Sequence, residues 1–178
     1  MGADLYNERF NAQSAEYQKV KADFEDLKNT IGNKQMSDVD RKQYGELVDK
    51  LYSHPYYFRE SYGGGGLISS LDLSWWNDII PLFDINPPEN LSDEEIDAWH
   101  DANDINMSSE ACQKFIDLLE SRKGMLSAAD YDRTDSCPDW QTGETITWHV
   151  GDELRNRYNR LVDFLVIGVQ HGGIYASL

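Results

Sequence analysis

The most chemically specific pattern in this sequence is a stripe of carboxylates between residues 93 and 104. Four aspartates follow one another at intervals of four, four and three residues, with a glutamate beside the first: Asp93, Asp97, Asp101, Asp104 and Glu94. These intervals place the carboxylates along one side of an α-helix. Residues four apart rise about 6 Å along the helix axis, a distance comparable with the phosphate spacing of a nucleic-acid strand. The stripe therefore predicts a surface that imitates the charge of DNA.

A simpler interpretation, a solvated helix face, explains only part of the stripe. Ser92 and Glu95 form a capping-box pattern, so the helix begins at Ser92 and its first turn favours negative charge. This accounts for Asp93 and Glu94. It does not account for Asp101 and Asp104, which lie toward the end of the helix where the dipole disfavours a carboxylate.

Trp75 and Trp76 are the candidate apolar anchor of the same surface. Adjacent residues on a helix point about 100° apart, so both indole rings cannot face the core. We expect one of them at a rim, where tryptophan often dominates the energy of an interface. The predicted partner is a basic protein surface, in particular that of a nucleic-acid-binding protein.

The alternative hypothesis is a small-ligand pocket built from the aromatic segment that precedes and follows a glycine loop at 63–66. Tyr57, Arg59 and Tyr62 are its candidate residues, within an aromatic and glycine-rich segment at 52–76. The same rings can also form a corner of the core. The glycine run is not a phosphate-binding loop of the usual kind, because no Lys-Ser or Lys-Thr follows it.

The sequence contains no recognisable motif for catalysis, metal binding or cofactor binding. The four histidines are scattered, and no nucleophile lies in a recognisable setting with a base. The segment 101–110 fails as a calcium loop because the glycine at its sixth position is missing. Cys112 and Cys137 form neither a disulfide framework nor a zinc pattern. We therefore predict a non-enzymatic protein without a metal or cofactor.

The net charge of −16 is concentrated in the middle of the chain. Residues 61–120 carry 13 acidic and 1 basic side chains, against 11 and 9 in residues 1–60 and 8 and 6 in residues 121–178. Such a field disfavours direct binding to nucleic acid or to anionic membranes. No leader or membrane-spanning run is visible, and a length of 178 residues predicts a single domain, 1–178, in the cytoplasm.

Hydrophobic periodicity predicts a mainly α fold of about five to six helices in one compact domain. Apolar residues recur at helical intervals in six segments: 6–31, 39–51, 67–82, 92–102, 109–123 and 154–169. The first segment predicts one long amphipathic helix that ends near Gly32. Residues 144–150 have the composition of a strand, so we expect at most a short strand or hairpin there, after an irregular stretch at 126–143.

Several motifs together resemble a group of small uncharacterised proteins encoded by bacteria and their phages. They are the N-terminal Met1–Tyr6, the Tyr-Phe-Arg segment 57–62, the Leu-Ser-Trp-Trp segment 71–76 and the C-terminal Ala-Ser-Leu ending at Leu178. The resemblance implies a bacterial or phage origin, and hence the cytoplasm of a bacterial host. In that setting an acidic interaction protein would be a DNA-mimic inhibitor of a host defence nuclease, such as an anti-CRISPR protein. The resemblance carries no catalytic residue.

Overall fold

The computed structural model shows an α+β fold, so the prediction of a mainly α fold is wrong. It describes residues 2–32, 35–61, 66–84, 92, 105–139 and 142–177. Within these ranges a four-stranded and a two-stranded antiparallel sheet accompany the helices. The four-stranded sheet has the order β2-β1-β6-β3 and joins strands from distant parts of the chain. Its strands are β1 (Gly2–Tyr6), β2 (Tyr57–Ser61), β3 (Ile105–Met107) and β6 (Ile174–Ser177).

The strand register gives the four-stranded sheet one apolar and one tyrosine-rich face. Leu5 pairs with Phe58 on one side and Ala176 on the other, and all three side chains are buried. One residue further along, Tyr6 pairs with Tyr57 and Tyr175, which point to the opposite face because side chains alternate along a strand. The three tyrosines are half-buried.

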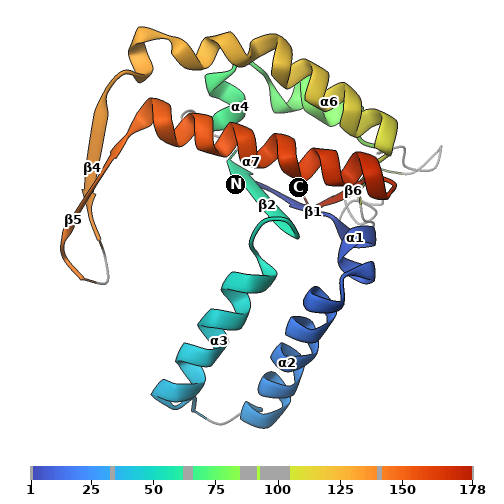
Figure 1. Cartoon of the computed structure of the whole chain (residues 1–178), viewed down its shortest axis with the longest axis vertical. Helices are drawn as coiled ribbons and strands as arrows, with labels where there is room; N and C mark the ends of the chain where they lie inside the picture. The colour runs from blue at the N-terminus through green and yellow to red at the C-terminus, as the bar shows by residue number, and fades with distance from the viewer. Residues whose placement is uncertain are drawn as a thin grey trace.

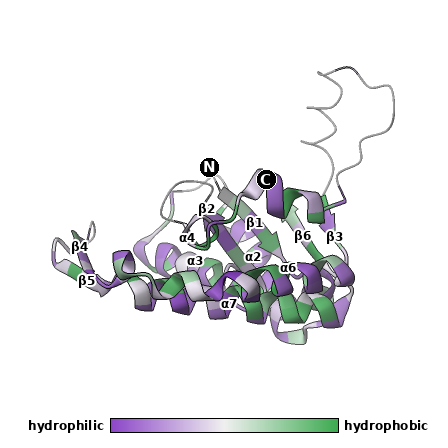
Figure 2. Cartoon of the chain, turned by 90° about the horizontal axis from the view of Figure 1, so that it is seen from above, coloured by the Kyte–Doolittle hydropathy of each residue, from purple (hydrophilic) through white to green (hydrophobic). Residues whose placement is uncertain are grey.

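Two helices cover the apolar face of the sheet. They are α6 (Ser109–Arg122), which begins at the N-cap Ser108, and α7 (Val150–His171), which ends at Gly172. Both helices carry apolar residues along one side and polar residues along the other, which Figure 2 shows in green and purple. Phe115 and Phe164 are fully buried, and the Phe164 ring lies 6.2 Å from that of Phe58. Both of these helices agree with the sequence prediction, although α7 is longer.

The predicted long N-terminal helix is divided. Residues up to Tyr6 belong to β1, followed by α1 (Glu8–Gln13) and α2 (Ala15–Ile31). The break is at Ser14, which has an extended backbone. Its side-chain hydroxyl caps α2 by accepting a hydrogen bond from the backbone N–H of Tyr17. Helix α2 ends at Gly32, as expected. Helix α3 (Asp38–Leu51) begins with the predicted cap at Ser37, which forms a capping box.

Helices α2 and α3 project together from the body and have a small core of their own (Figure 1). Its buried members are Leu27, Ile31 and Leu47. The hairpin of β4 (Thr134–Pro138) and β5 (Thr145–His149) projects separately from the start of α7 (Figure 1). The expected strand is therefore present, but residues 134–138, predicted to be irregular, form its partner.

The described segment 66–84, which follows β2, is made of short helices. It contains α4 (Leu67–Ser70), the π-helix η1 (Trp75–Ile79) and the 3₁₀-helix η2 (Ile80–Leu82), with Ser74 capping η1 as predicted. Two further 3₁₀ turns, η3 (Lys123–Ser127) and η4 (Ala129–Tyr131), follow α6. The predicted helix at 92–102 lies outside the described residues apart from Ser92. Every described helix is too short or too polar to cross a lipid bilayer.

Replacing Gly173 by alanine is expected to destabilise the fold strongly. Gly173 has a φ of +110°, and a Cβ there would lie 2.1 Å from the carbonyl oxygen of Met107. Strain and displacement of β3 together should lower the free energy of unfolding by about 3 kcal/mol. The control is Gly45→Ala in α3, where a Cβ meets no atom within 4 Å. It should stabilise the protein by about 0.5–1 kcal/mol, because alanine is the better helix former. Urea denaturation of both variants measures the difference, and a Gly173 variant as stable as the parent contradicts this packing.

The two cysteines should react very differently with thiol reagents. Cys112 is buried, and burial raises the pKa of its thiol to about 11, whereas Cys137 is exposed. Because the thiolate is the reactive form, native protein at mildly alkaline pH should be alkylated once, at Cys137. Unfolding should expose the second thiol. The folded state also holds the Cys112 proton more tightly than the unfolded state does. The free energy of unfolding should therefore fall as the pH rises above the unfolded thiol pKa of about 8.5. Mass spectrometry with iodoacetamide tests the labelling, and rapid native labelling of Cys112 would contradict it.

Candidate functional site

A buried ion pair fixes the edge strand β2 to the helix α7. Glu60 is 1% exposed, and its Oε2 accepts a hydrogen bond of 2.9 Å from Nη2 of Arg157. Its other oxygen, Oε1, accepts the backbone N–H of Leu67 at 2.8 Å, at the beginning of α4. One carboxylate therefore joins three elements, and it holds the Arg157 side chain at the free edge of the sheet.

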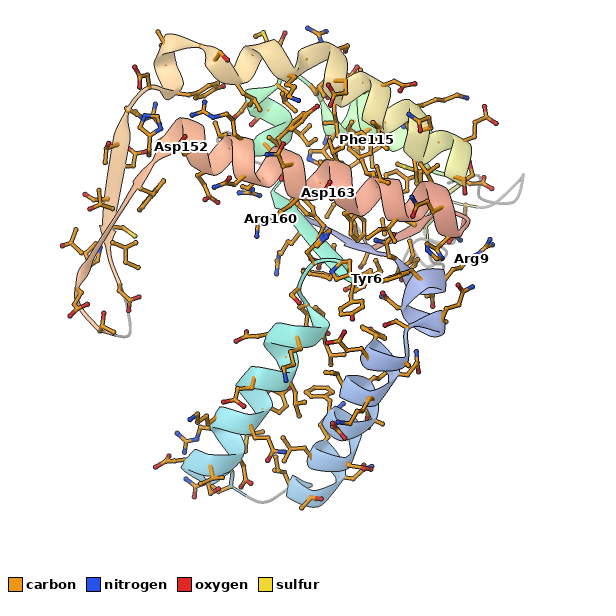
Figure 3. All side chains as sticks on the ribbon, viewed as in Figure 1. Tyr6, Arg9, Phe115, Asp152, Arg160 and Asp163 are labelled. Carbon is orange, nitrogen blue, oxygen red and sulfur yellow. The ribbon has the colours of Figure 1, made fainter. Side chains whose placement is uncertain are left out.

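The face of α7 beside this ion pair carries a second arginine. Glu153, Arg157 and Arg160 lie four and three residues apart, so their side chains share one side of the helix. Arg160 is exposed and forms no ion pair with any residue in the described ranges. It projects from the side of α7 that faces the space between the α2–α3 pair and the β4–β5 hairpin (Figure 3).

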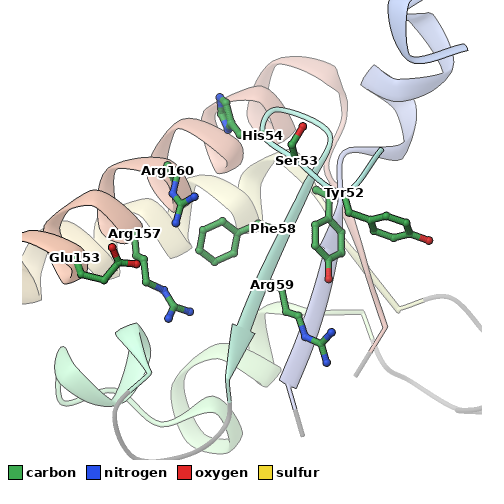
Figure 4. A pocket seen from close by; sticks show the side chains of 9 residues that line it. Tyr52, Ser53, His54, Phe58, Arg59, Glu153, Arg157 and Arg160 are labelled. Atoms are coloured by element: carbon green, nitrogen blue, oxygen red, sulfur yellow. The ribbon is translucent and has the colours of Figure 1, made fainter. Parts of the chain in front are cut away.

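These side chains line a cavity of about 330 Å³ at the edge of β2, between the end of α3 and α7. Figure 4 shows the α7 side chains on one side of β2, with the ring of Phe58 directed toward them. Arg59 leaves the strand in another direction, near Tyr52 (Figure 4). The cavity is lined by Tyr52, Ser53, His54, Tyr57, Phe58, Arg59, Glu153, Arg157 and Arg160.

Arg59 and Tyr57 share a carboxylate on the outer face of the sheet. Asp4 lies opposite Arg59 in the strand register, and its Oδ1 is 3.5 Å from Nε of Arg59. The hydroxyl of Tyr57 donates a hydrogen bond to the same oxygen. Burial and this hydrogen bond to Asp4 raise the pKa of Tyr57 well above its usual value. The phenol is therefore neutral over the whole physiological range.

The cavity is suited to hold a small organic anion. Guanidinium groups bind phosphate and carboxylate through paired N–H donors, and three of them line this cavity against one carboxylate, Glu153. The volume lies at the lower end of the range for small-molecule sites, and tyrosine and phenylalanine rings supply apolar wall. Among the described residues, no three His, Cys, Asp or Glu side chains gather as a metal site requires.

The structure brings together two of the three residues predicted for the alternative pocket. Tyr57 and Arg59 both line the cavity, whereas Tyr62 lies outside the described residues. Sequence reasoning missed Arg157 and Arg160, which are about a hundred residues away in the chain. The available signal was two arginines three positions apart on the predicted final helix of a strongly acidic protein.

The residues predicted for the acidic surface divide into two groups. Trp75 is buried in η1 and Trp76 is 71% exposed, so only one of the two rings faces the core, as expected. The five carboxylates of the stripe lie outside the described residues: Asp93, Glu94, Asp97, Asp101 and Asp104.

Comparisons of the chain with protein-family models, with curated proteins and with solved structures found no match.

Removing the charge of Glu60 should cost more stability than removing that of an exposed glutamate. Glu60→Gln leaves Arg157 without a counter-ion beneath β2. Because the Arg157 side chain is 26% exposed and water reaches part of it, we expect a loss of about 2 kcal/mol, below the range for a fully buried pair. The matched control is Glu25→Gln, which removes a surface pair with Lys28 on α2. Equal unfolding midpoints of the two variants in urea would contradict the structural role of Glu60.

Proposed function

We propose that this protein is a non-enzymatic binding protein for a small organic anion, held in the cavity between β2 and α7. The observation that carries the proposal is that Arg157 and Arg160 of α7 line one cavity, with Arg59 of β2 lining it from the other side of the strand (Figure 4). The chain has only 16 lysines and arginines against 32 acidic residues. A local concentration of guanidinium groups in such an acidic protein needs a structural or a functional explanation. A structural role, the ion pair with Glu60, fully explains only Arg157.

The three arginines differ in how available they are to a ligand. Arg157 is engaged by the buried carboxylate of Glu60, and Arg59 lies beside Asp4 at the surface. Arg160 has no carboxylate partner among the described residues. It is therefore the arginine whose charge would be satisfied by a bound phosphate or carboxylate group, and it is the first residue to test.

The polar groups near the arginines favour binding over chemistry. The hydroxyl of Ser53 donates a hydrogen bond of 2.9 Å to the carbonyl oxygen of Lys50, so its proton is not directed to a neighbouring base. The hydroxyl of Tyr57 likewise donates to Asp4, and its raised pKa keeps the phenol protonated at physiological pH, so it is not available as a base. The proposal assigns these groups to shaping the cavity and assigns the charge recognition to arginine.

A second candidate function is favoured by the exposure of Trp76. A tryptophan that is 71% exposed fits the anchor of a protein interface, and Asp72, four residues before it, has a side chain that is 74% exposed. This agrees with the hypothesis of a phage-encoded, DNA-mimicking inhibitor that binds a basic nucleic-acid-binding protein such as a CRISPR effector. Trp76→Ala should then abolish capture of such a partner from a bacterial lysate, while retained capture would count against it.

Anion binding can be measured as thermal stabilisation of the purified protein. The panel is inorganic phosphate, pyrophosphate, adenosine monophosphate and citrate. A member present at a hundred times its dissociation constant should stabilise the fold by about 2.7 kcal/mol, which corresponds to a Tm increase of about 5–10 °C for a chain of this size. Arg160→Gln should remove most of this increase without changing the Tm of the free protein.

The matched control is Arg155→Gln on the same helix. Arg155 is ion-paired with Asp152 and does not line the cavity. Its loss should leave the ligand-induced Tm increase unchanged. If no anion of the panel raises the Tm, or if both variants lose the increase equally, the proposed site is wrong.

A further inference from the structure

A second cavity, of about 210 Å³, lies where α1 and α2 meet the tyrosine-rich face of the sheet. Figure 3 shows Tyr6 at this junction, above the projecting pair α2 and α3. The walls combine three tyrosines and Ala12 with four polar side chains: Tyr6, Tyr17, Tyr175, Ala12, Glu8, Asn11, Gln18 and Lys21. No arginine lines this cavity, so its chemistry differs from that of the cavity beside α7.

Asn11 provides a buried acceptor without a donor. The residue is 4% exposed, and its Nδ2 donates to the carbonyl oxygen of Tyr56 at 3.2 Å. This bond fixes the orientation of the amide. The Oδ1 atom is buried and accepts no hydrogen bond from any described residue. Such an acceptor is costly unless a donor reaches it, and Asn11 is one of the residues that line this cavity, so we assign its missing donor to a ligand N–H or O–H.

The tyrosines offer π-faces rather than charge. The rings of Tyr6 and Tyr175 are 5.4 Å apart and inclined by 38°. Burial, followed by the proximity of Asp4 and of other tyrosines, raises the pKa of Tyr6. Burial, followed by the proximity of Tyr52 and Glu8, raises the pKa of Tyr17. These phenols are therefore neutral at physiological pH, and the faces of neutral aromatic rings attract cations.

Glu8 adds a negative charge that forms no ion pair with a described cation. Its side chain is exposed on the first turn of α1 and forms no ion pair within the described ranges. Its carboxylate is close enough to Tyr17 to contribute to the raised pKa of that phenol. Aromatic faces, a carboxylate and a carbonyl acceptor are three features that favour the binding of an organic ammonium ion.

We propose that this cavity binds a small organic ammonium that carries at least one N–H. The rings of Tyr6, Tyr17 and Tyr175 surround the alkyl groups and the positive charge. Glu8 supplies the counter-charge at the mouth, and Asn11 Oδ1 accepts the N–H. The proposal does not depend on anion binding beside α7, because the two cavities have no lining residue in common.

Lys21 allows a test of the charge of the ligand. Its ammonium group lines the same cavity, and it forms no ion pair with any described residue. A cationic ligand is repelled by Lys21, so removing this charge should tighten binding. A neutral sugar or an anion would instead use Lys21 as a donor, and removing it should weaken binding.

The probe is trimethylammonium chloride, titrated into the full-length, isotope-labelled protein at neutral pH. The side-chain amide signal of Asn11 and the ring signals of the three tyrosines should shift together and saturate. Glu8→Gln should weaken the affinity by about fivefold, and Lys21→Gln should strengthen it by about twofold, as expected for charges partly screened by water. Tetramethylammonium, which has no N–H, should bind more weakly than trimethylammonium.

The control is Glu25→Gln on α2, which removes an equal charge away from the cavity and should leave the affinity unchanged. Glu8 and Lys21 are exposed, so both variants should keep the parental Tm, and a thermal melt checks this. The proposal is overturned if trimethylammonium shifts none of the four signals. It is equally overturned if Lys21→Gln weakens binding, or if Glu25→Gln weakens binding as much as Glu8→Gln.

Discussion

The pairing of β1 with both β2 and β6 is the constraint on which the rest of the structure depends. Leu5 lies between Phe58 and Ala176, so the first strand of the chain joins a strand from its middle to the last one. This register also decides that Tyr6, Tyr57 and Tyr175 share the outer face, because a shift by one residue would exchange the two faces of β1. The sheet is complete only when the C-terminal strand is available, and such non-local pairing makes folding slow relative to that of a helical bundle.

Two arginines on α7 illustrate how one helix face can serve structure and binding together. Taking a charge out of water is costly, and the Glu60–Arg157 pair offsets this cost by satisfying the backbone N–H of Leu67 as well as the guanidinium. Arg157 is therefore committed to the fold. Arg160, three residues later, is exposed and has no such ion pair among the described residues, so we expect the fold to tolerate its replacement. The proposed anion site depends on this difference: Arg157 fixes the geometry of the cavity, and Arg160 supplies the available charge.

The sequence predicted the helices better than the sheet, for physical reasons. Helical periodicity and capping are local, and the signals at Ser37, Ser74 and Ser108 each correspond to a helix start in the structure. The strands of the main sheet have only three to five residues, too few to show a clear alternation, and their partners are far away in the chain. Tyr6 also continued the helical spacing of the following residues by coincidence. For the same reason Tyr57 and Arg59 could be proposed as pocket residues from their own segment, but their neighbours on α7 could not.

A chain of tyrosines connects the two proposed sites. Tyr52, Tyr57, Tyr6 and Tyr175 follow one another with ring centroids 5.1, 5.3 and 5.4 Å apart. The first two rings line the arginine cavity and the last two line the second cavity. Asp4, between them, is balanced by Arg59 and by the hydroxyl of Tyr57. The middle of the outer face is thus nearly neutral, while the ligands proposed for the cavities at its two ends have opposite charges. A net charge of −16 describes the long-range field of this protein, but the recognition of a small ligand is decided within a few ångströms, where these local groups outweigh the total.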